Sequence, residues 1–285
     1  MTASFNQQVI EEFRTNAGRV GGMFEGAPLV LLHTAGAKTG RPRTNPAVYL
    51  ADGDRILVFA SNAGQPKNPD WYANLLADPR VTVEIGLDDG VETYAADAVP
   101  LDGEERNRFF RLQAERDPAF AAYQAGTTRT IPVIALKRLD LAADPARTRA
   151  IGEYLVRVHD ELRGELATVR KEVDDFFGGR VAEVRLGKRL STHCLAFCDA
   201  LRVHHTREDG VFTEFEKQFP ELRPALDRLR REHHVVAGTL TELQALLADL
   251  GVADGDRVRD EFERLASGLE EHFAYEEEQL LPALS

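Results

Sequence analysis

The hydrophobic pattern of this chain changes its period near Asp140, and this change limits the fold more than any other feature of the 285 residues. Before Asp140, short apolar runs rich in Val, Ile, Tyr and Phe alternate with turn sequences, which is typical of strands. Beyond it, apolar residues recur almost throughout at the spacing of amphipathic helices. Each half has roughly 140 residues, enough for a core of its own. We therefore predict one domain over residues 1–140 and a second over residues 147–285.

The first half is predicted to be α+β, with a mostly antiparallel sheet or barrel. Its strand-like runs include LVLLHT, AVYLADGDRILVFASN, VTVEIG and IPVIAL. Asp52-Gly53-Asp54, within the second of these runs, predicts a tight hairpin. Helical patterns cover residues 5–16 and 68–76, and a third amphipathic segment follows Gly103.

The second half is predicted to be an all-α four-helix bundle. Helical periodicity covers residues 147–174, 186–217, 221–248 and 255–281. Glycine and proline separate these segments, at Gly178-Gly179, at Phe219-Pro220 and between Gly251 and Gly255. Similar lengths and short connections favour an up-down-up-down topology.

Composition argues against several classes of protein. The formal net charge is −12, which does not suit nucleic acid or an anionic membrane as a partner. No basic-then-apolar start resembles a signal peptide, and no apolar run approaches the roughly 18 residues of a membrane span, so we expect a cytoplasmic protein. Cys194 and Cys198 are one helical turn apart and are interpreted as core residues rather than as a disulfide.

The histidines of the second half predict a metal site, because seven of the eight in the chain follow the domain boundary. His204 with Glu208, and His272 with Glu276, are i, i+4 pairs. This spacing puts an imidazole and a carboxylate on the same face of a helix. The segments that carry the pairs, HHTREDGVF and HFAYEEEQL, align without a gap, so two helices repeat one motif.

The other two helices supply further imidazoles, His159 on the first and either His233 or His234 on the third. Carboxylates that can bridge two ions, combined with imidazoles and no thiolate, suit iron or manganese rather than structural zinc. A buried carboxylate also needs a positive partner, which a pair of metal ions would supply. We therefore predict a centre of two iron ions, with manganese as the open alternative.

These motifs resemble the hemerythrin-like, or HHE cation-binding, family over residues 147–285. The resemblance implies one histidine from each helix and a bridging glutamate from the second and fourth helices, and its register favours His233 over His234. The implied ligands are His159, His204, Glu208, His233, His272 and Glu276. Ala237 stands where oxygen-carrying members have a second histidine, and Glu276 stands one residue before the position of their aspartate. Redox, oxygen-sensing, peroxide or iron-handling roles are therefore favoured over reversible oxygen carriage.

Three other histidines are interpreted as non-ligands. His205 and His234 point about 100° away from their neighbours His204 and His233, so exposed or supporting positions are expected for them. His193 precedes His204 by three helical turns, roughly 16 Å along the axis, which leaves it a core or gating role.

The first half contains a basic loop in which Lys38, Arg41 and Arg43 surround a glycine turn between two strands, a pattern that predicts anion binding. Three long segments surround or follow this loop: LLHTAGAKTGRPRTNPAVYL, ASNAGQPKNPDWYANLLADPRVTVEIG and YQAGTTRTIPVIAL. Together they resemble the deazaflavin-dependent nitroreductase family, whose members bind coenzyme F-420 on a split β-barrel. The likeness covers nearly all of residues 5–138.

This second resemblance implies a set of cofactor and substrate residues. Lys38, Arg43 and Thr44 would hold the phosphate and glutamate tail of F-420, and Phe59, Ala60, Ser61 and Asn62 would contact its ring. A helix start would line the pocket with Asp70, Trp71, Tyr72, Ala73 and Asn74, and Tyr123 is the catalytic candidate on the substrate side. Core packing is the alternative for Trp71 and Tyr72, His33 is expected to be a plain strand residue, and FMN is the alternative cofactor.

We therefore expect an oxidoreductase that uses reduced F-420 at the barrel to act on a small-molecule substrate or oxidant. Its di-iron centre would act on dioxygen, peroxide or nitric oxide. The alternative is a non-enzymatic oxygen or redox sensor, or an iron-binding protein, whose barrel is only a cofactor-binding or dimerisation platform. A homodimer through the barrel is compatible with either function.

Overall fold

A computed structural model gives the structure of the protein and describes residues 3–141, 145–177, 184–248 and 255–284. Contacts between Cα atoms divide the chain into two units, residues 1–139 with the segment Thr206–Glu214, and residues 140–205 with 215–285. That segment belongs to one continuous helix, so we describe it with the other long helices. We call the two parts the barrel unit and the helical unit.

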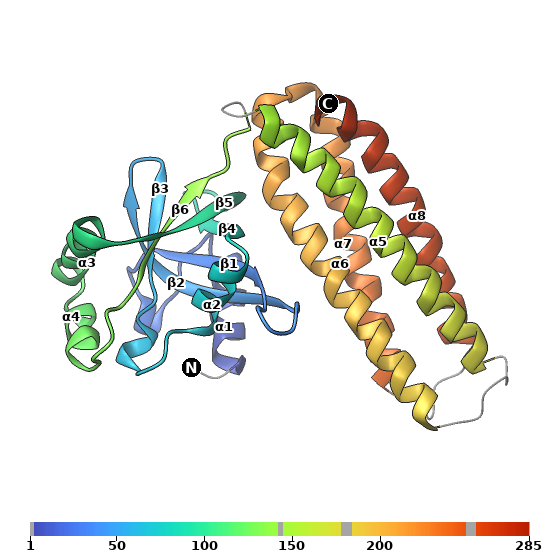
Figure 1. The fold of residues 1–285 in the computed structure, drawn as a ribbon, viewed down its shortest axis with the longest axis horizontal. Helices are drawn as coiled ribbons and strands as arrows, with labels where there is room; N and C mark the ends of the chain where they lie inside the picture. Colours follow the sequence, from blue (N-terminus) through green and yellow to red (C-terminus); the bar gives the residue numbers. More distant parts are fainter. Residues whose placement is uncertain (1–2, 142–144, 178–183, 249–254, 285) are drawn as a thin grey trace. The chain divides into compact units, whose positions relative to one another are not determined.

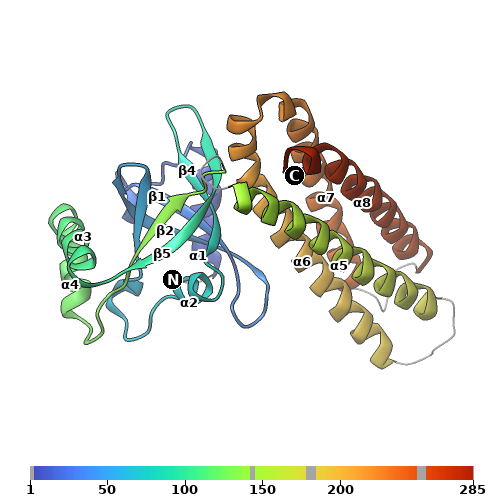
Figure 2. The same cartoon turned by 45° about the horizontal axis from the view of Figure 1, so that its top comes forward.

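The barrel unit is a closed antiparallel β-barrel (Figure 1, Figure 2). Its strands are β1 Leu29–Ala35, β2 Pro42–Asp52, β3 Arg55–Phe59, β4 Arg80–Gly86, β5 Val91–Leu101 and β6 Val133–Arg138. They follow the order β1-β2-β3-β6-β5-β4 around the barrel. The predicted hairpin is confirmed, because Asp52 pairs with Arg55, and Gly53 between them has φ +63°, which glycine adopts without steric cost.

Strand β1 is buried on both faces, which explains why its sequence is a continuous apolar run rather than an alternating one. Val30 and Leu32 belong to the cluster that fills the barrel. Leu29 and Leu31 point to the other face, where they pack with Phe13 of helix α1, Ala3–Thr15.

Three more helices belong to the barrel unit. The helix predicted over residues 68–76 is α2, Asp70–Ala77. The amphipathic segment after Gly103 forms two helices instead of one, α3 Gly103–Arg116 and α4 Pro118–Ala125. Asp117 separates them because its backbone is extended, and its carboxylate accepts a hydrogen bond from the amide of Ala119 at 3.0 Å.

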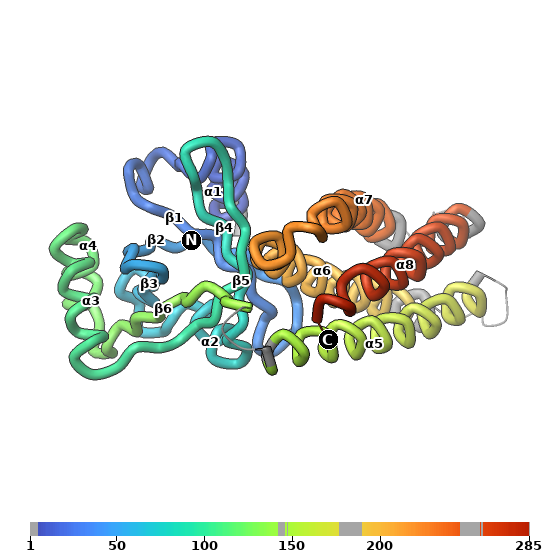
Figure 3. Tube along the Cα trace, turned by 90° about the horizontal axis from the view of Figure 1, so that it is seen from above, coloured from blue at the N-terminus to red at the C-terminus, as the bar shows by residue number. Residues whose placement is uncertain are grey.

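The helical unit is an up-down-up-down bundle of four long helices (Figure 1, Figure 3). They are α5 Pro145–Phe177, α6 Val184–Gln218, α7 Arg223–Ala248 and α8 Gly255–Leu284, and the 3-10 turn η3 Pro220–Leu222 precedes α7. The predicted fold class, an α+β barrel followed by an all-α bundle, is confirmed. The expected breaks at Gly178-Gly179 and at Gly251 to Asp254 lie outside the described residues.

The bundle encloses one apolar core that draws on all four helices. It includes Leu166 of α5, Leu240 of α7 and Leu269 of α8. Cys194 and Cys198 of α6 are buried in this core as free thiols, as predicted. Burial raises the pKa of the Cys194 thiol to about 12, so little of the reactive thiolate forms at neutral pH. Within the described part of the chain, every helix is too short or too polar to cross a membrane.

Candidate functional site

All six predicted metal ligands are buried side chains in the middle of the bundle. Two groups of candidate ligand atoms form there, and within each group these atoms lie within 4.8 Å of one another. The first group is His159, His204, Glu208 and Glu276, and the second is His205, His233 and His272. The structure thus brings together residues from four helices, and it adds His205 to the predicted set.

The helical period explains why these polar side chains point into the core. In each helix the histidine stands three residues from a residue of the apolar core: Leu162 follows His159, Leu201 precedes His204, Val236 follows His233 and Leu269 precedes His272. Residues three apart share a helix face, so the histidines continue the buried stripe. Polar groups in such positions are costly unless they are hydrogen-bonded or bind an ion.

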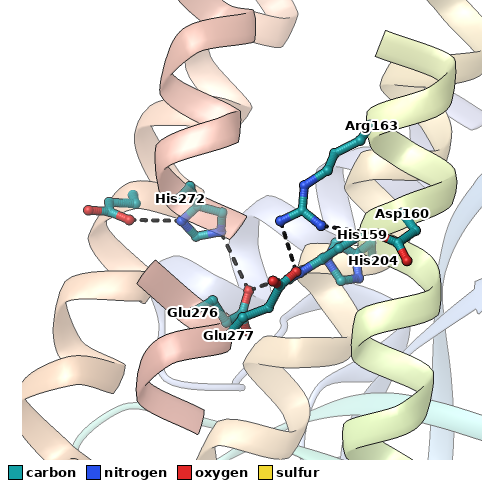
Figure 4. Close-up of polar contacts among 8 residues, drawn as sticks. His159, Asp160, Arg163, His204, His272, Glu276 and Glu277 are labelled. Carbon is teal, nitrogen blue, oxygen red and sulfur yellow. Dashed lines mark hydrogen bonds and ion pairs between the residues drawn. The ribbon is translucent and has the colours of Figure 1, made fainter. Parts of the chain in front are cut away.

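Glu276 lies at the centre of the first group and is 0% exposed. Its Oε2 is 3.5 Å from His159 Nε2 and 3.7 Å from His272 Nε2. Figure 4 shows Glu276 between these two histidines. Neither of its carboxylate oxygens accepts a hydrogen bond from a described residue. A buried carboxylate in these surroundings needs a cation, and a metal ion held by the same imidazoles fits that need.

His159 and His204 are spaced as two ligands of one ion would be. Their Nε2 atoms are 3.0 Å apart, and the side chain of His159 is fully buried. Two nitrogens at right angles on one ion, each at about 2.1 Å as in metal–imidazole bonds, would also be about 3.0 Å apart. The donor set of this group therefore suits a divalent or trivalent metal ion.

Two carboxylates outside the groups orient the histidine rings. His159 Nδ1 is 2.8 Å from Glu277 Oε1, and Arg163 donates to the same oxygen at 2.9 Å (Figure 4). His272 Nδ1 is likewise 2.8 Å from Glu232 Oε2. A carboxylate on Nδ1 leaves Nε2 as the atom that can bind a metal, and it raises the basicity of the ring.

The sequence interpretation missed both of these carboxylates. Burial raises the pKa of Glu232, but hydrogen bonds from His272 and Arg228 outweigh it and leave this pKa below its usual value. The sequence did contain a signal for them, because each is adjacent to a predicted ligand: Glu232 precedes His233, and Glu277 follows Glu276. Their partners, however, lie on other helices, which only the packing of the bundle determines.

Of the two positions expected for His205, exposed or supporting, the exposed one is wrong. Its side chain is only 6% exposed and its ring stacks on that of His233, with centroids 4.1 Å apart. The rotation of about 100° from His204 turns it toward another helix of the bundle rather than toward solvent. His204 faces α5, whereas His205 faces α7 and α8.

The other two histidines lie outside the groups. His234 is exposed, as expected, while His233 is 4% exposed, so the structure favours the choice of His233. His193 is also exposed, and its Nδ1 is 2.9 Å from a carboxylate oxygen of Glu172 on α5. A core role for His193 is therefore wrong.

In the barrel unit, the basic segment runs from the loop between β1 and β2 into the start of β2, with Lys38 exposed in the loop and Arg43 exposed in the strand. Gly40 has φ +65°, and its amide donates to the carbonyl of Gly36 at 2.7 Å, which closes the turn. The buried side chain of Asn74 holds the loop from α2 by accepting a hydrogen bond from the amide of Ala37 at 2.9 Å. Asn74 therefore positions the loop, whatever contact it makes with a ligand.

Thr44 belongs to a chain of hydrogen bonds that joins the neighbouring strands β2, β1 and β4 to α1. Its hydroxyl is 3.1 Å from His33 Nδ1, and His33 Nε2 is 2.6 Å from Glu84 Oε1. Arg14 of α1 donates to Glu84 Oε2 at 2.9 Å. Burial raises the pKa of Glu84, but the hydrogen bonds from His33 and Arg14 outweigh it and lower this pKa to about 2. His33 is thus a strand residue with a structural partner.

The segment after β3, predicted to contact the cofactor ring, has an unusual backbone. Asn62 and Ala63 in the short helix η2, Asn62–Gly64, have φ values of 47° and 50°, in the left-handed region. Such conformations persist only where the surroundings impose them, and they cluster at functional sites. Arg129 supplies part of this restraint, because it donates to the carbonyls of Ser61 at 2.7 Å and of Gln65 at 3.0 Å. The sequence interpretation missed Arg129, although it lies in the segment YQAGTTRTIPVIAL.

Several predicted ring contacts have side chains that are already packed. The ring of Phe59 packs on that of Phe120 with centroids 5.4 Å apart, and Ala60 is fully buried, with its amide donating to the carbonyl of Pro132 at 3.0 Å. Trp71 belongs to the barrel core, as the alternative interpretation held.

The remaining predicted residues differ in exposure. Tyr72 and Ser61 are half-buried, and Asp70 and Ala73 are exposed. Tyr123 is half-buried, and a side chain at Gly64 would meet its carbonyl at 2.9 Å, so α4 and η2 are in close contact. The structure therefore places the catalytic candidate beside the predicted ring-binding segment.

Comparison with known proteins relates the two units to different families. The family model for F-420H(2)-dependent quinone reductase matches residues 6–138, and the model for the hemerythrin HHE cation binding domain matches residues 150–284. An F-420H(2)-dependent quinone reductase of Mycobacterium tuberculosis is 38% identical over 130 residues, which are 44% of this chain and 85% of that protein.

Two solved structures are similar to the first part of the chain. An F-420H(2)-dependent reductase is 39% identical, with 39% of this chain and 94% of that chain covered and a TM-score of 0.35. A structure described as a domain-swapped dimer is 36% identical, with 47% and 96% covered and a TM-score of 0.37. On the family match and the Mycobacterium relative, the chain belongs to the F-420H(2)-dependent quinone reductase family through residues 6–138, and it carries a hemerythrin HHE cation binding domain over residues 150–284.

Proposed function

We propose that the protein is an oxidoreductase in which the barrel unit uses reduced F-420 and the helical unit holds two iron ions that act on dioxygen, peroxide or nitric oxide. The observation that carries the metal centre is the fully buried carboxylate of Glu276, close to imidazoles of α5 and α8. The proposal for the barrel rests on the family, and because its relatives are named quinone reductases, a quinone is the substrate class that we propose.

In the barrel unit, Lys38 and Arg43 are proposed to bind the acidic tail of F-420, because both are exposed cations, one on the loop between β1 and β2 and the other at the start of β2. Asn74 keeps that loop in place, and Arg129 does the same for the ring-binding segment that contains Ser61. Tyr123 is proposed to contact the substrate. When bound, F-420 would supply the hydride.

F-420 suits this loop better than FMN does. FMN offers one phosphate, whereas F-420 adds the carboxylates of its tail, and the loop presents Lys38, Arg41 and Arg43 in six consecutive residues. More positive charge is present than one phosphate requires. FMN is the alternative cofactor, and a titration that compares the affinities for F-420 and FMN distinguishes the two.

In the helical unit, His159 and His204 are proposed to hold one iron ion, and His233 and His272 the other. Glu208 and Glu276 would bridge the two ions, which carboxylates can do because each has two donor oxygens. When bound, the ions would supply one-electron chemistry toward oxygen species. Glu232 and Glu277 hold the rings of His272 and His159 in place, as their hydrogen bonds show.

A non-enzymatic role is the second candidate. The different electron chemistry of F-420 and iron supports it, because it makes direct transfer from the barrel to the bundle difficult. Reduced F-420 gives up two electrons together as a hydride, whereas two ferric ions accept electrons singly. Without a carrier between them, the bundle would serve as an oxygen or redox sensor or an iron-binding module. The barrel would then be a cofactor-binding or dimerisation platform. A homodimer and a cytoplasmic location also stay predictions.

Two measurements on the purified protein test the proposal. Iron analysis should give about two ions per chain, with the ultraviolet absorption of bridged ferric iron. Oxidation of reduced F-420 should proceed with a soluble quinone as the acceptor. A protein that binds F-420 but does not turn it over with any acceptor would favour the sensor, and one zinc per chain without iron would exclude the di-iron centre.

A further inference from the structure

Helix α6 carries two adjacent histidines, and both are buried. The exposed fraction is 5% for His204 and 6% for His205. Neighbouring residues on a helix point about 100° apart, so one of such a pair usually faces solvent. Here each ring faces a different helix, since His204 Nε2 is 3.0 Å from His159 Nε2 of α5, while His205 stacks on His233 of α7.

His205, His233 and His272 converge from three helices. The rings of His205 and His233 are nearly parallel, at 9°, with centroids 4.1 Å apart. The ring of His272 stands across them, at 76° to His205 and 69° to His233, with centroid distances of 5.2 and 5.0 Å. One nitrogen from each ring lies within 4.8 Å of the others, so the three nitrogens are close enough together to be candidate ligands of one ion.

The donor atoms around these rings also suit a cation. Each imidazole has a ring nitrogen that can donate a lone pair to a metal ion, and the carboxylate oxygen Oε2 of Glu276 is 3.7 Å from His272 Nε2. On α7 the next turn offers no ligand, because Ala237 is exposed and lacks a donor atom.

We infer that His205 is a metal ligand and completes a three-imidazole site for the second ion. This inference rests on the proposed di-iron centre and makes its two ions unequal. One ion would have the imidazoles of His159 and His204 and the other would have three imidazoles, with Glu208 and Glu276 as the proposed bridging carboxylates. Neutral ligands stabilise the lower charge of an ion, so the three-imidazole ion is the one that holds ferrous iron more readily.

Substitution of His205, with metal content and spectra as the readout, tests this assignment. Wild-type protein should contain about two irons per chain, with two distinct Mössbauer doublets, whereas His205→Ala should keep about one iron and one doublet. Added imidazole should restore the second iron, because the free ligand can occupy the cavity left by the side chain. His234→Ala is the matched control, since it removes an exposed histidine that lies beside a ligand.

A second variant of His205 and the iron content of the wild-type protein make every outcome of the test interpretable. His205→Gln retains a buried polar group, so it covers the case in which the alanine variant fails to fold, and it should lose the same doublet. Two irons and unchanged doublets in the folded variants would overturn the assignment, as would an equal loss in His234→Ala. A wild-type protein without iron would instead overturn the di-iron centre itself, and the inference with it.

Discussion

The two candidate sites are built in opposite ways. In the helical unit, the candidate ligands are buried side chains that project from four helices into one layer. In the barrel unit, the candidate residues are spread over the loop after β1, the start of β2, the segment after β3 and the helices α2 and α4, and Lys38 and Arg43 are exposed. Other contacts fix parts of this backbone: Asn74 holds the basic loop, and Arg129 holds the segment after β3. The first site is thus one buried cluster of side chains, whereas the second combines residues of several elements.

The largest expected effect is loss of the metal centre in a His204→Ala, Glu276→Ala variant. These changes remove an imidazole and a buried carboxylate from one group of ligands, so iron should fall from about two per chain to near zero. Metal analysis measures this, and circular dichroism checks that the helices remain. His193→Ala is the control, because it removes an exposed histidine of the same helix. Unchanged iron in the double variant would contradict the site.

A smaller effect is expected at the basic loop. Arg43→Ala removes one exposed cation, and the lost charge-assisted hydrogen bond should weaken F-420 binding by about tenfold. FMN binding should change less, since one phosphate needs fewer cations. Fluorescence titration measures both affinities, with Arg116→Ala, an exposed arginine at the end of α3, as the control. If a variant without Lys38 and Arg43 binds F-420 as tightly as the wild type does, the basic loop is not part of the cofactor site.

The same contrast explains how much could be predicted from the sequence. Helical periodicity was enough to put His204 with Glu208, and His272 with Glu276, on the same face of their helices, because residues four apart share a helix face whatever surrounds them. It did not show that His205 is buried, since a buried helix contacts two neighbours, and a rotation of about 100° leads to the second of them rather than to solvent.

In the barrel, sequence likeness identified the segments but not what fixes them. Arg129 donates to the carbonyl of Ser61, which is 68 residues away in sequence, and Asn74 binds the amide of Ala37 from another element. Neither contact follows from a local pattern. Likewise, the extended backbone at Asp117 divided an amphipathic segment into α3 and α4, because Pro118 starts a new helix there.

The free energy of unfolding of the barrel should fall moderately in acid. Because the folded-state pKa of Glu84 is lowered to about 2, its stabilising effect is present above pH 4.5 and is lost as the pH falls from 4.5 toward 2. The loss is at most about 3 kcal/mol. Urea unfolding followed by the fluorescence of Trp71, the one tryptophan of the chain, reports on the barrel. Glu84→Gln should flatten this pH dependence, and an equal slope in both proteins would contradict the role of the carboxylate.

The smallest expected effect is catalytic coupling between the barrel site and the metal site. If both act in one reaction, loss of iron should slow the oxidation of reduced F-420 by dioxygen but leave F-420 affinity nearly unchanged. Covalent linkage raises the effective concentration of one site near the other, yet a hydride donor and ferric ions still require a carrier of single electrons. The measurement is reduced F-420 consumption by wild type and by a folded His204→Ala, His272→Ala variant. Equal rates with several oxidants would mean that the units act independently, and the bundle would then be better understood as a sensor or an iron-binding module.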